Sequence, residues 1–256
     1  MNRSDDLISS QHEGAISVLR FEDPDHRNAL SVEMLEVFLA KLADVASEPG
    51  TILRLEGAGS AFCAGIDLEA GRRDPAILTR LLELLSEAMR SIRSMPRVVV
   101  AQAQGAAIAG GCALLSACDF TCGEPGTRVG YPVTRVGLSA AVSVPTLLGS
   151  VSSSAARSLL LEGSVIDGAR AHRMNLLTHL APSTEALPGM VDELCGQLSR
   201  KGPNAMLRTK AWLNELDGST QESKHEAALG HSVSSAKDEE AMLMLERNWK
   251  NRKERR

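Results

Sequence analysis

Apolar and polar residues alternate along two short segments in the first quarter of the chain, residues 15–21 and 51–57. Alternation with a period of two is typical of a β-strand that buries one face. A third segment, residues 97–105, begins with a continuous apolar run and is typical of a strand that is buried on both faces. The three segments predict strands of one sheet.

Helical patterns separate these strands. Ser31 is expected to cap a helix over residues 32–46, and apolar residues recur at helical spacing from Leu78 to Ile92, just before Pro96. Strands that alternate with helices predict an α/β fold in which parallel strands are joined by right-handed crossovers.

The last third of the chain has a different character. After Gly149 the strand patterns fade, and helices are predicted over residues 152–161, 167–174, 185–198, 203–216 and 222–250. We therefore expect an α/β core over residues 1–195 and a helical C-terminal extension over residues 196–256. The extension has too few apolar residues to form a well-packed domain alone, and we expect its apolar face to pack on the core or on another subunit.

Composition narrows the classes of protein to which the chain can belong. With 256 residues, of which 43% are hydrophobic, it can bury a large core, and its net charge of -4 argues against nucleic acid as a partner. No apolar run is long enough for a membrane span, and the first residues do not resemble a signal peptide, so a cytoplasmic protein is expected. The five cysteines have no spacing typical of disulfides or of a metal site, so no metal is expected.

Two segments rich in small residues carry the candidate chemistry: SAFCAGIDL at 60–68 and QGAAIAGGCALLSACD at 104–119. The first directly follows a predicted strand, at the carboxyl end where open α/β sheets bind ligands. In the second, Gly110 and Gly111 precede a predicted short helix, whose first amides and dipole favour negative charge. The two segments together predict an oxyanion hole. Taken singly, each of them is more simply explained by close packing of a helix on a strand.

In this order, the two segments resemble the crotonase superfamily, the enoyl-CoA hydratase/isomerase group. DHRNALS at 25–31 and the stretches at 118–138 and 159–180 are similar to further motifs of the same family, so the resemblance covers nearly the whole chain. It implies a crotonase-like spiral of ββα units with a helical C-terminal extension. It also implies assembly as a homotrimer or a hexamer.

The resemblance also implies a ligand and the residues that bind it. The backbone N–H groups of Ala64 and Gly110 would bind the thioester oxygen of an acyl-CoA and stabilise an enolate. Coenzyme A would be part of the substrate, and no separate cofactor is expected. The remaining residues expected at coenzyme A are Arg27, Ala29, Gly65, Ile66, Asp67 and Leu68.

Two positions depart from the family pattern. Where hydratases of the family carry catalytic glutamates, this chain has Ala113, three residues after Gly110, and Val133, directly after Pro132. Since neither side chain can transfer a proton, efficient hydration by the usual pair is not expected. Decarboxylation, isomerisation and thioester hydrolysis through an enolate stay open.

The sequence therefore leaves open which residue transfers protons to or from the substrate. Tyr131, the only tyrosine, is a candidate proton donor, with packing in the core as the alternative. Cys63 and Cys112 flank the predicted donors and are expected to be buried, unreactive thiols. An inactive acyl-CoA-binding protein and an oligomeric scaffold are the alternatives to an enzyme.

Overall fold

The main sheet has six strands, in the order β1-β2-β3-β4-β6-β9. The structure is a computed structural model that describes residues 7–254, with side chains described up to residue 250. The strands are β1 (Ile8–Glu13), β2 (Ile16–Phe21), β3 (Ile52–Gly57), β4 (Val98–Gln102), β6 (Phe120–Gly123) and β9 (His179–Leu180). β1 is antiparallel to β2, and all the other neighbours are parallel.

The three predicted strands are confirmed as β2, β3 and β4, whereas β1 was not predicted. β1 lies at the edge of the sheet, and its last four residues are exposed. A strand that buries so few side chains leaves little apolar pattern in the sequence.

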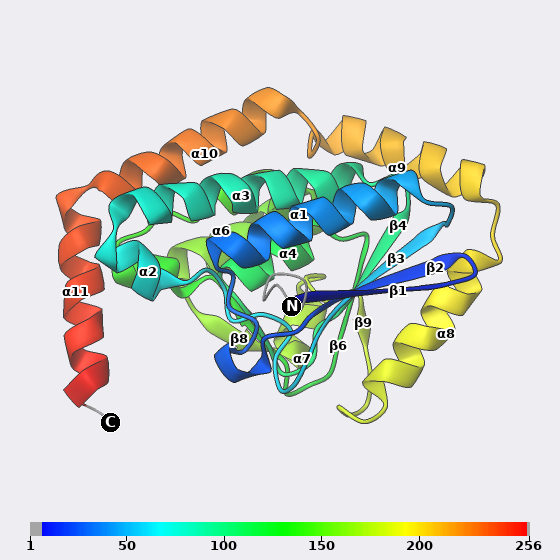
Figure 1. Ribbon diagram of the computed structural model, residues 1–256, viewed down its shortest axis with the longest axis horizontal. Coiled ribbons are helices and arrows are strands. Elements are labelled where there is room, and N and C mark those ends of the chain that lie inside the picture. Colours follow the sequence, from blue (N-terminus) through cyan, green and yellow to red (C-terminus); the bar gives the residue numbers. More distant parts are fainter. Residues whose placement is uncertain (1–6, 255–256) are drawn as a thin grey trace, which may run out of the picture.

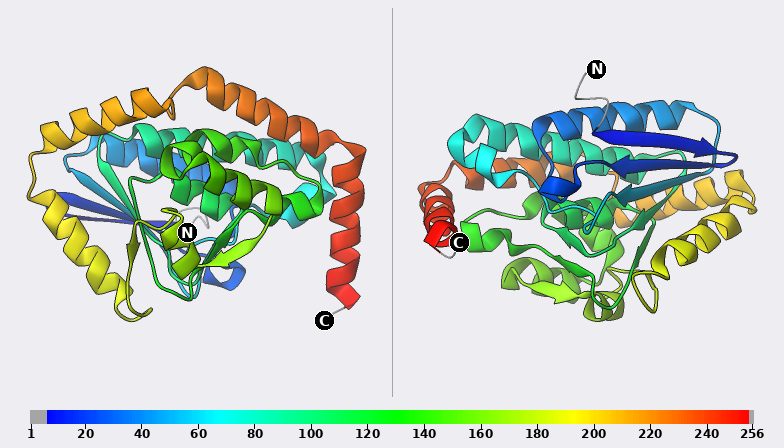
Figure 2. Two further views of the ribbon diagram at one scale, coloured as in Figure 1. Left: turned by 180° about the vertical axis from the view of Figure 1, so that it is seen from behind. Right: turned by 60° about the horizontal axis from the view of Figure 1, so that its bottom comes forward.

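Helices cover both faces of this sheet (Figures 1 and 2). On one face, α1 (Val32–Ser47) and α3 (Pro75–Ser94) enclose the main hydrophobic core. Ser31 caps α1 as predicted, because its Oγ accepts a hydrogen bond of 3.0 Å from the N–H of Met34. On the other face, α8 (Leu187–Ser199) forms a second, smaller core with β3, β4 and β6.

A second sheet of three strands lies beside the first, in the order β5-β7-β8. Its strands are β5 (Ala106–Ile108), β7 (Arg128–Gly130) and β8 (Val165–Asp167). The chain passes from β4 in the large sheet to β5 in the small one and then into α4 (Gly110–Ala117); it repeats this path through β6, β7 and α5 (Val144–Ser150). These ββα units form the crotonase-like spiral that the family resemblance implied.

The remaining helices complete the C-terminal half: α6 (Ser153–Glu162), α7 (Gly168–Arg173), α9 (Pro203–Asp217), α10 (Glu222–Lys237) and α11 (Glu239–Glu254). The prediction of one continuous helix over residues 222–250 is wrong. The backbone of Asp238 is extended, so the chain turns there and continues as a separate helix, α11. α10 lies along α3, and α11 descends at the end of the molecule next to α2 (Leu68–Arg73) (Figure 1).

The expected division at residue 195 falls inside α8. Both Cys195 and Leu198 of this helix are buried against the main sheet, so all of α8 packs with the core. Over residues 7–254, no helix has both the length and the apolar composition that a bilayer crossing requires.

Candidate active site

The segment that follows β3 runs between two other parts of the chain and forms hydrogen bonds with each. Cys63 pairs with β5, because its N–H donates to Ala106 (3.1 Å) and its carbonyl accepts from Ile108 (3.0 Å). Farther along, the carbonyl of Gly65 accepts from Leu30 (2.8 Å), and the N–H of Asp67 donates back to Leu30 (3.0 Å). These bonds fix the residues on both sides of Ile66.

Gly65 turns the backbone between these two sets of bonds. Its φ of +98° lies in the region that favours glycine, and an added Cβ would come within 2.7 Å of the carbonyl oxygen of Ile108. Because of this turn, the N–H of Ile66 points away from Leu30, and it has no hydrogen-bond acceptor among residues 7–254.

The second amide is that of Gly110, the first residue of α4. A helix leaves its first N–H groups without intrahelical acceptors, and its dipole places a partial positive charge there. Ala109, just before it, has φ +50°, which is uncommon for a residue with a Cβ, and its N–H is held by the carbonyl of Gly130 at 2.8 Å. All of α4 is buried, so its dipole acts away from bulk water.

The two amides are neighbours. A Cβ built on Gly110 would lie 3.3 Å from the nitrogen of Ile66, and a Cβ built on Gly65 would lie 3.4 Å from the nitrogen of Gly110. Two unpaired N–H groups therefore meet at the start of a buried helix, which is the arrangement that stabilises a developing oxyanion.

This geometry corrects one predicted residue. The N–H of Ala64 donates to the carbonyl of Arg27 at 3.0 Å, so it is not available to a ligand. The free amide beside Gly110 belongs to Ile66, which the sequence analysis had placed only at coenzyme A. The glycine at 65 was the one signal in the sequence, but its φ was needed to tell which neighbouring amide faces Gly110.

The other residues expected at coenzyme A lie around the same segment. Arg27 is exposed and has φ +54°, and Ala29 is half-buried in the same loop. Asp67 caps α2, because its Oδ1 accepts from the N–H groups of Glu69 (3.0 Å) and Ala70 (3.1 Å). Leu68 is half-buried and packs against the main core.

The two positions without glutamates are apolar in the structure as well. Ala113 is fully buried on α4, one turn after Gly110. Val133 lies on a short 3-10 helix (Pro132–Val136) and packs, half-buried, on the main core. Neither position offers a group that can donate or accept a proton.

Tyr131 directly precedes this 3-10 helix and is 1% exposed. Its hydroxyl makes no hydrogen bond of good geometry within residues 7–254, although the side chains of Cys112, Ser116 and Ser143 lie close enough to influence its pKa. Burial raises its pKa well above the usual value, so the hydroxyl stays protonated. The structure thus places the candidate donor inside the core, next to Gly130 and the start of α4.

The last helix, α11, places an acidic side chain next to α2, the helix that directly follows the candidate site segment. On α11, Glu246 lies 2.9 Å from Arg72 of α2, whose guanidinium also lies 5.0 Å from the centre of the Trp249 ring. α11 also contacts the 3-10 helix that carries Val133. Only tertiary structure brings these residues together, because 174 positions separate Arg72 from Glu246 in sequence.

The thiols are buried, as expected. Burial raises the pKa of both Cys63 and Cys112 to about 12, so neither is a thiolate near neutral pH. Within the described part of the chain, no three His, Cys, Asp or Glu side chains group as metal ligands would.

Comparison with known proteins agrees with this architecture. The sequence profile of the enoyl-CoA hydratase/isomerase family matches residues 11–253. A Thermus thermophilus protein provisionally named enoyl-CoA hydratase is 32% identical over 217 residues, which are 80% of this chain and 83% of that protein. The crotonyl-CoA hydratase of Syntrophomonas wolfei is 28% identical and covers 81% of each chain.

Solved structures show the same fold. An enoyl-CoA hydratase from Mycobacterium avium has a TM-score of 0.84 at 26% identity, over 96% of each chain. An enoyl-CoA hydratase/isomerase from Mycobacterium paratuberculosis has a TM-score of 0.85 at 22% identity, over 94% of this chain and 98% of that one. The chain belongs to the enoyl-CoA hydratase/isomerase family, in the crotonase superfamily.

Proposed function

We propose that this protein binds an acyl-CoA thioester and stabilises the enolate of its acyl group through the N–H groups of Ile66 and Gly110. The observation that carries the proposal is the pair of unpaired amides at the start of buried α4. Two such donors stabilise negative charge on the thioester oxygen, and loss of one typically lowers the rate about 10²–10³-fold. Relatives named for enoyl-CoA and crotonyl-CoA support a CoA thioester as the ligand.

Coenzyme A would lie along the loop of Arg27 and Ala29 and the backbone of Ala64 to Leu68. The exposed guanidinium of Arg27 suits a phosphate, because it is always charged and carries several donors. The N–H of Ala64 fixes this loop to the segment that carries Ile66.

Decarboxylation is the reaction that this pocket fits best. When a carboxylate on the α-carbon leaves as CO2, its bonding electrons form the enolate, and no base is needed. The wall at Ala113 and Val133 supplies no base, and the two amides hold the charge until the α-carbon takes up a proton. Tyr131 is our candidate for that proton's donor. Isomerisation and thioester hydrolysis require proton transfers for which this wall has no group.

The assembly we propose is a homotrimer, or a hexamer of two trimers. α9 supports it, because Lys210 and Asn214 of this helix are buried while Trp212, Leu213 and Leu216 are 56%, 57% and 66% exposed. A helix that faces its own domain with polar residues and presents apolar ones is typical of a subunit interface.

The test uses the infrared carbonyl band of bound [1-13C]butyryl-CoA and the release of CO2 from malonyl-CoA. In the wild type, two donors should lower the carbonyl stretching frequency, and CO2 should be released. Gly110→Pro removes one donor, and its Cβ would also crowd the second, 3.3 Å from the nitrogen of Ile66; proline is otherwise tolerated at the first position of a helix. We expect the band to move back toward its frequency in water and CO2 release to fall about 10²–10³-fold.

Ser153→Pro is the matched control, since Ser153 is exposed at the first position of α6. It should leave both readouts unchanged. An unshifted carbonyl band in the wild type would refute the oxyanion hole. A shifted band without turnover of any acyl-CoA would instead identify an inactive acyl-CoA-binding protein.

A further inference from the structure

We propose that Asn28 is the positioning residue of the oxyanion hole: its side chain fixes the loop of residues 23–30 and, through that loop, the direction of the Ile66 N–H. The inference rests on the proposed function for its catalytic meaning. That Asn28 orders the segment at 63–67 does not depend on the proposed function and is tested on the ligand-free protein.

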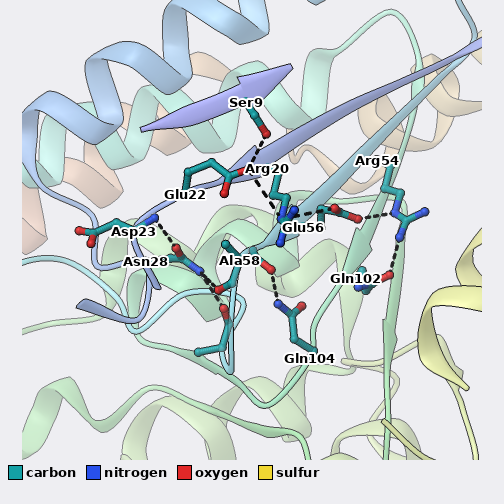
Figure 3. A network of polar contacts seen from close by, with 12 residues as sticks. Ser9, Arg20, Glu22, Asp23, Asn28, Arg54, Glu56, Ala58, Gln102 and Gln104 are labelled. Carbon is teal, nitrogen blue, oxygen red and sulfur yellow. Dashed lines mark hydrogen bonds and ion pairs between the residues drawn. The ribbon is translucent and has the colours of Figure 1, made fainter. Parts of the chain in front are cut away.

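The side chain of Asn28 is fully buried and makes three hydrogen bonds (Figure 3). Its Nδ2 donates to the carbonyls of Ala58 (3.0 Å) and Ala61 (2.8 Å), in the turn that leads from β3 to the site. Its Oδ1 accepts from the N–H of Asp23 at 3.0 Å. One side chain thus joins the loop at 23–30 to the turn after β3, and each hydrogen-bonding group of the amide has a partner.

The backbone at Arg27 and Asn28 has an unfavourable conformation that side-chain hydrogen bonds can stabilise. Arg27 and Asn28 both have φ +54°, and two consecutive residues with a Cβ in the left-handed region are strained. Asparagine tolerates this region better than most residues do. The three side-chain bonds stabilise a conformation that the backbone alone does not favour.

The loop so fixed holds the oxyanion segment from one side. The carbonyl of Arg27, next to Asn28, accepts from Ala64 at 3.0 Å, and Leu30 bonds with both Gly65 (2.8 Å) and Asp67 (3.0 Å). These bonds surround Ile66 on both sides and leave its own N–H free for a ligand. If the loop moves, Ile66 loses the partners that orient it toward Gly110.

Two variants test the hydrogen bonds of the Asn28 side chain in different ways. Asn28→Gly keeps the left-handed backbone accessible and removes all three side-chain bonds. Asn28→Asp keeps the size of the side chain and the acceptor for Asp23, but it places a carboxylate against two carbonyl oxygens. The matched control is Asn175→Gly, since Asn175 has φ +62°, is exposed and lies in the turn after α7.

The first measurement is amide hydrogen exchange of the free protein. In both Asn28 variants, exchange at Ala64 and in the peptide around it should be about tenfold faster or more, because several buried hydrogen bonds are lost together. Asn175→Gly should leave this peptide unchanged. Wild-type exchange at residues 61–67 in a folded Asn28→Gly protein overturns the inference, and if that variant does not fold, Asn28→Asp is judged by the same result.

The second measurement is the carbonyl band of bound [1-13C]butyryl-CoA. The Asn28 variants are saturated with ligand, because loosening the loop of Arg27 and Ala29 should also weaken coenzyme A binding. In the saturated variants the band should return toward its frequency in water, whereas a role in stability alone would leave the band of the folded variants unchanged. An unchanged band in the folded variants overturns the positioning role. If the wild type itself fails to shift the band, the proposed function is wrong, and the exchange data alone decide whether Asn28 orders the segment.

Discussion

Gly65 and Tyr131 show how much of this site depends on single residues. Gly65, with its positive φ, reverses the side toward which the backbone amides point, so that Ile66 rather than Ala64 offers its N–H. Tyr131 places a hydroxyl without a partner inside the core. A buried, unpaired hydroxyl destabilises the fold, and its presence is easier to understand if it acts on a substrate.

We predict opposite effects of Tyr131→Phe on stability and on catalysis. Removal of the unpaired hydroxyl should raise the free energy of unfolding by about 1 kcal/mol, measured by urea denaturation. If Tyr131 is the proton donor, the rate of malonyl-CoA decarboxylation should fall about 10²–10⁴-fold. A variant that is more stable and fully active would show that Tyr131 only packs.

The pH dependence follows from the direction of the pKa shift. The pKa of folded Tyr131 lies well above the usual 10, so the hydroxyl remains a donor throughout the range in which the protein is folded. Ionisation of Tyr131 should therefore add no fall in rate at alkaline pH. Above about pH 10 the free energy of unfolding should fall further, because the tyrosine of the unfolded chain ionises there while the buried one stays protonated.

At the level of elements, α9 is joined to the core by polar contacts. The Nζ of Lys210 donates to Asp119 Oδ2 (2.7 Å) and to the carbonyl of Arg97 (2.8 Å), and Asn214 donates to the carbonyl of Arg93 (3.0 Å). These contacts orient the helix with its apolar residues outward. The face of α9 that packs on the core is polar. The sequence pattern therefore predicted the helix, but it did not show which face of the helix contacts the core.

Lys210→Ala should destabilise the protein by about 1–3 kcal/mol, because it removes the charged partner of the half-buried Asp119, whose Oδ2 then keeps only the N–H of Val99 as a donor. The change is measured as a shift in the urea midpoint at constant slope. Lys201→Ala, at an exposed position, is the control and should change stability by less than about 0.5 kcal/mol. Equal effects of the two substitutions would mean that the pair with Asp119 contributes nothing.

For the whole molecule, we propose that the exposed apolar side chains of α9 form the interface between subunits. We expect the wild type to sediment as a homotrimer or a hexamer in analytical ultracentrifugation. The double variant Trp212→Ser, Leu216→Glu should sediment as a monomer with unchanged helix content, since both side chains are exposed in the single chain. A monomeric wild type would contradict the proposed assembly.

The sequence by itself determined the α/β order of the elements in the first part of the chain and the position of the candidate site along it. The alternating strands, the Ser31 cap, the α/β order and the two glycine segments all follow from local patterns, and the absence of glutamates at Ala113 and Val133 is a fact of the sequence. These features are readable because strand and helix periods and turn residues act over a few neighbouring positions.

Only the tertiary structure decided which groups meet. The availability of the Ile66 amide depends on one φ angle and on bonds to Leu30 and Arg27, and the pairing of Arg72 with Glu246 joins distant helices. Strand β1 and the turn at Asp238 are different: β1 pairs with the adjacent strand β2, and the N–H of Asp238 donates to the nearby Ser235 carbonyl, so both are local features that leave only a weak pattern in the sequence. The direction of a backbone N–H is set by long-range hydrogen bonds and steric fit, and neither leaves a period in the sequence.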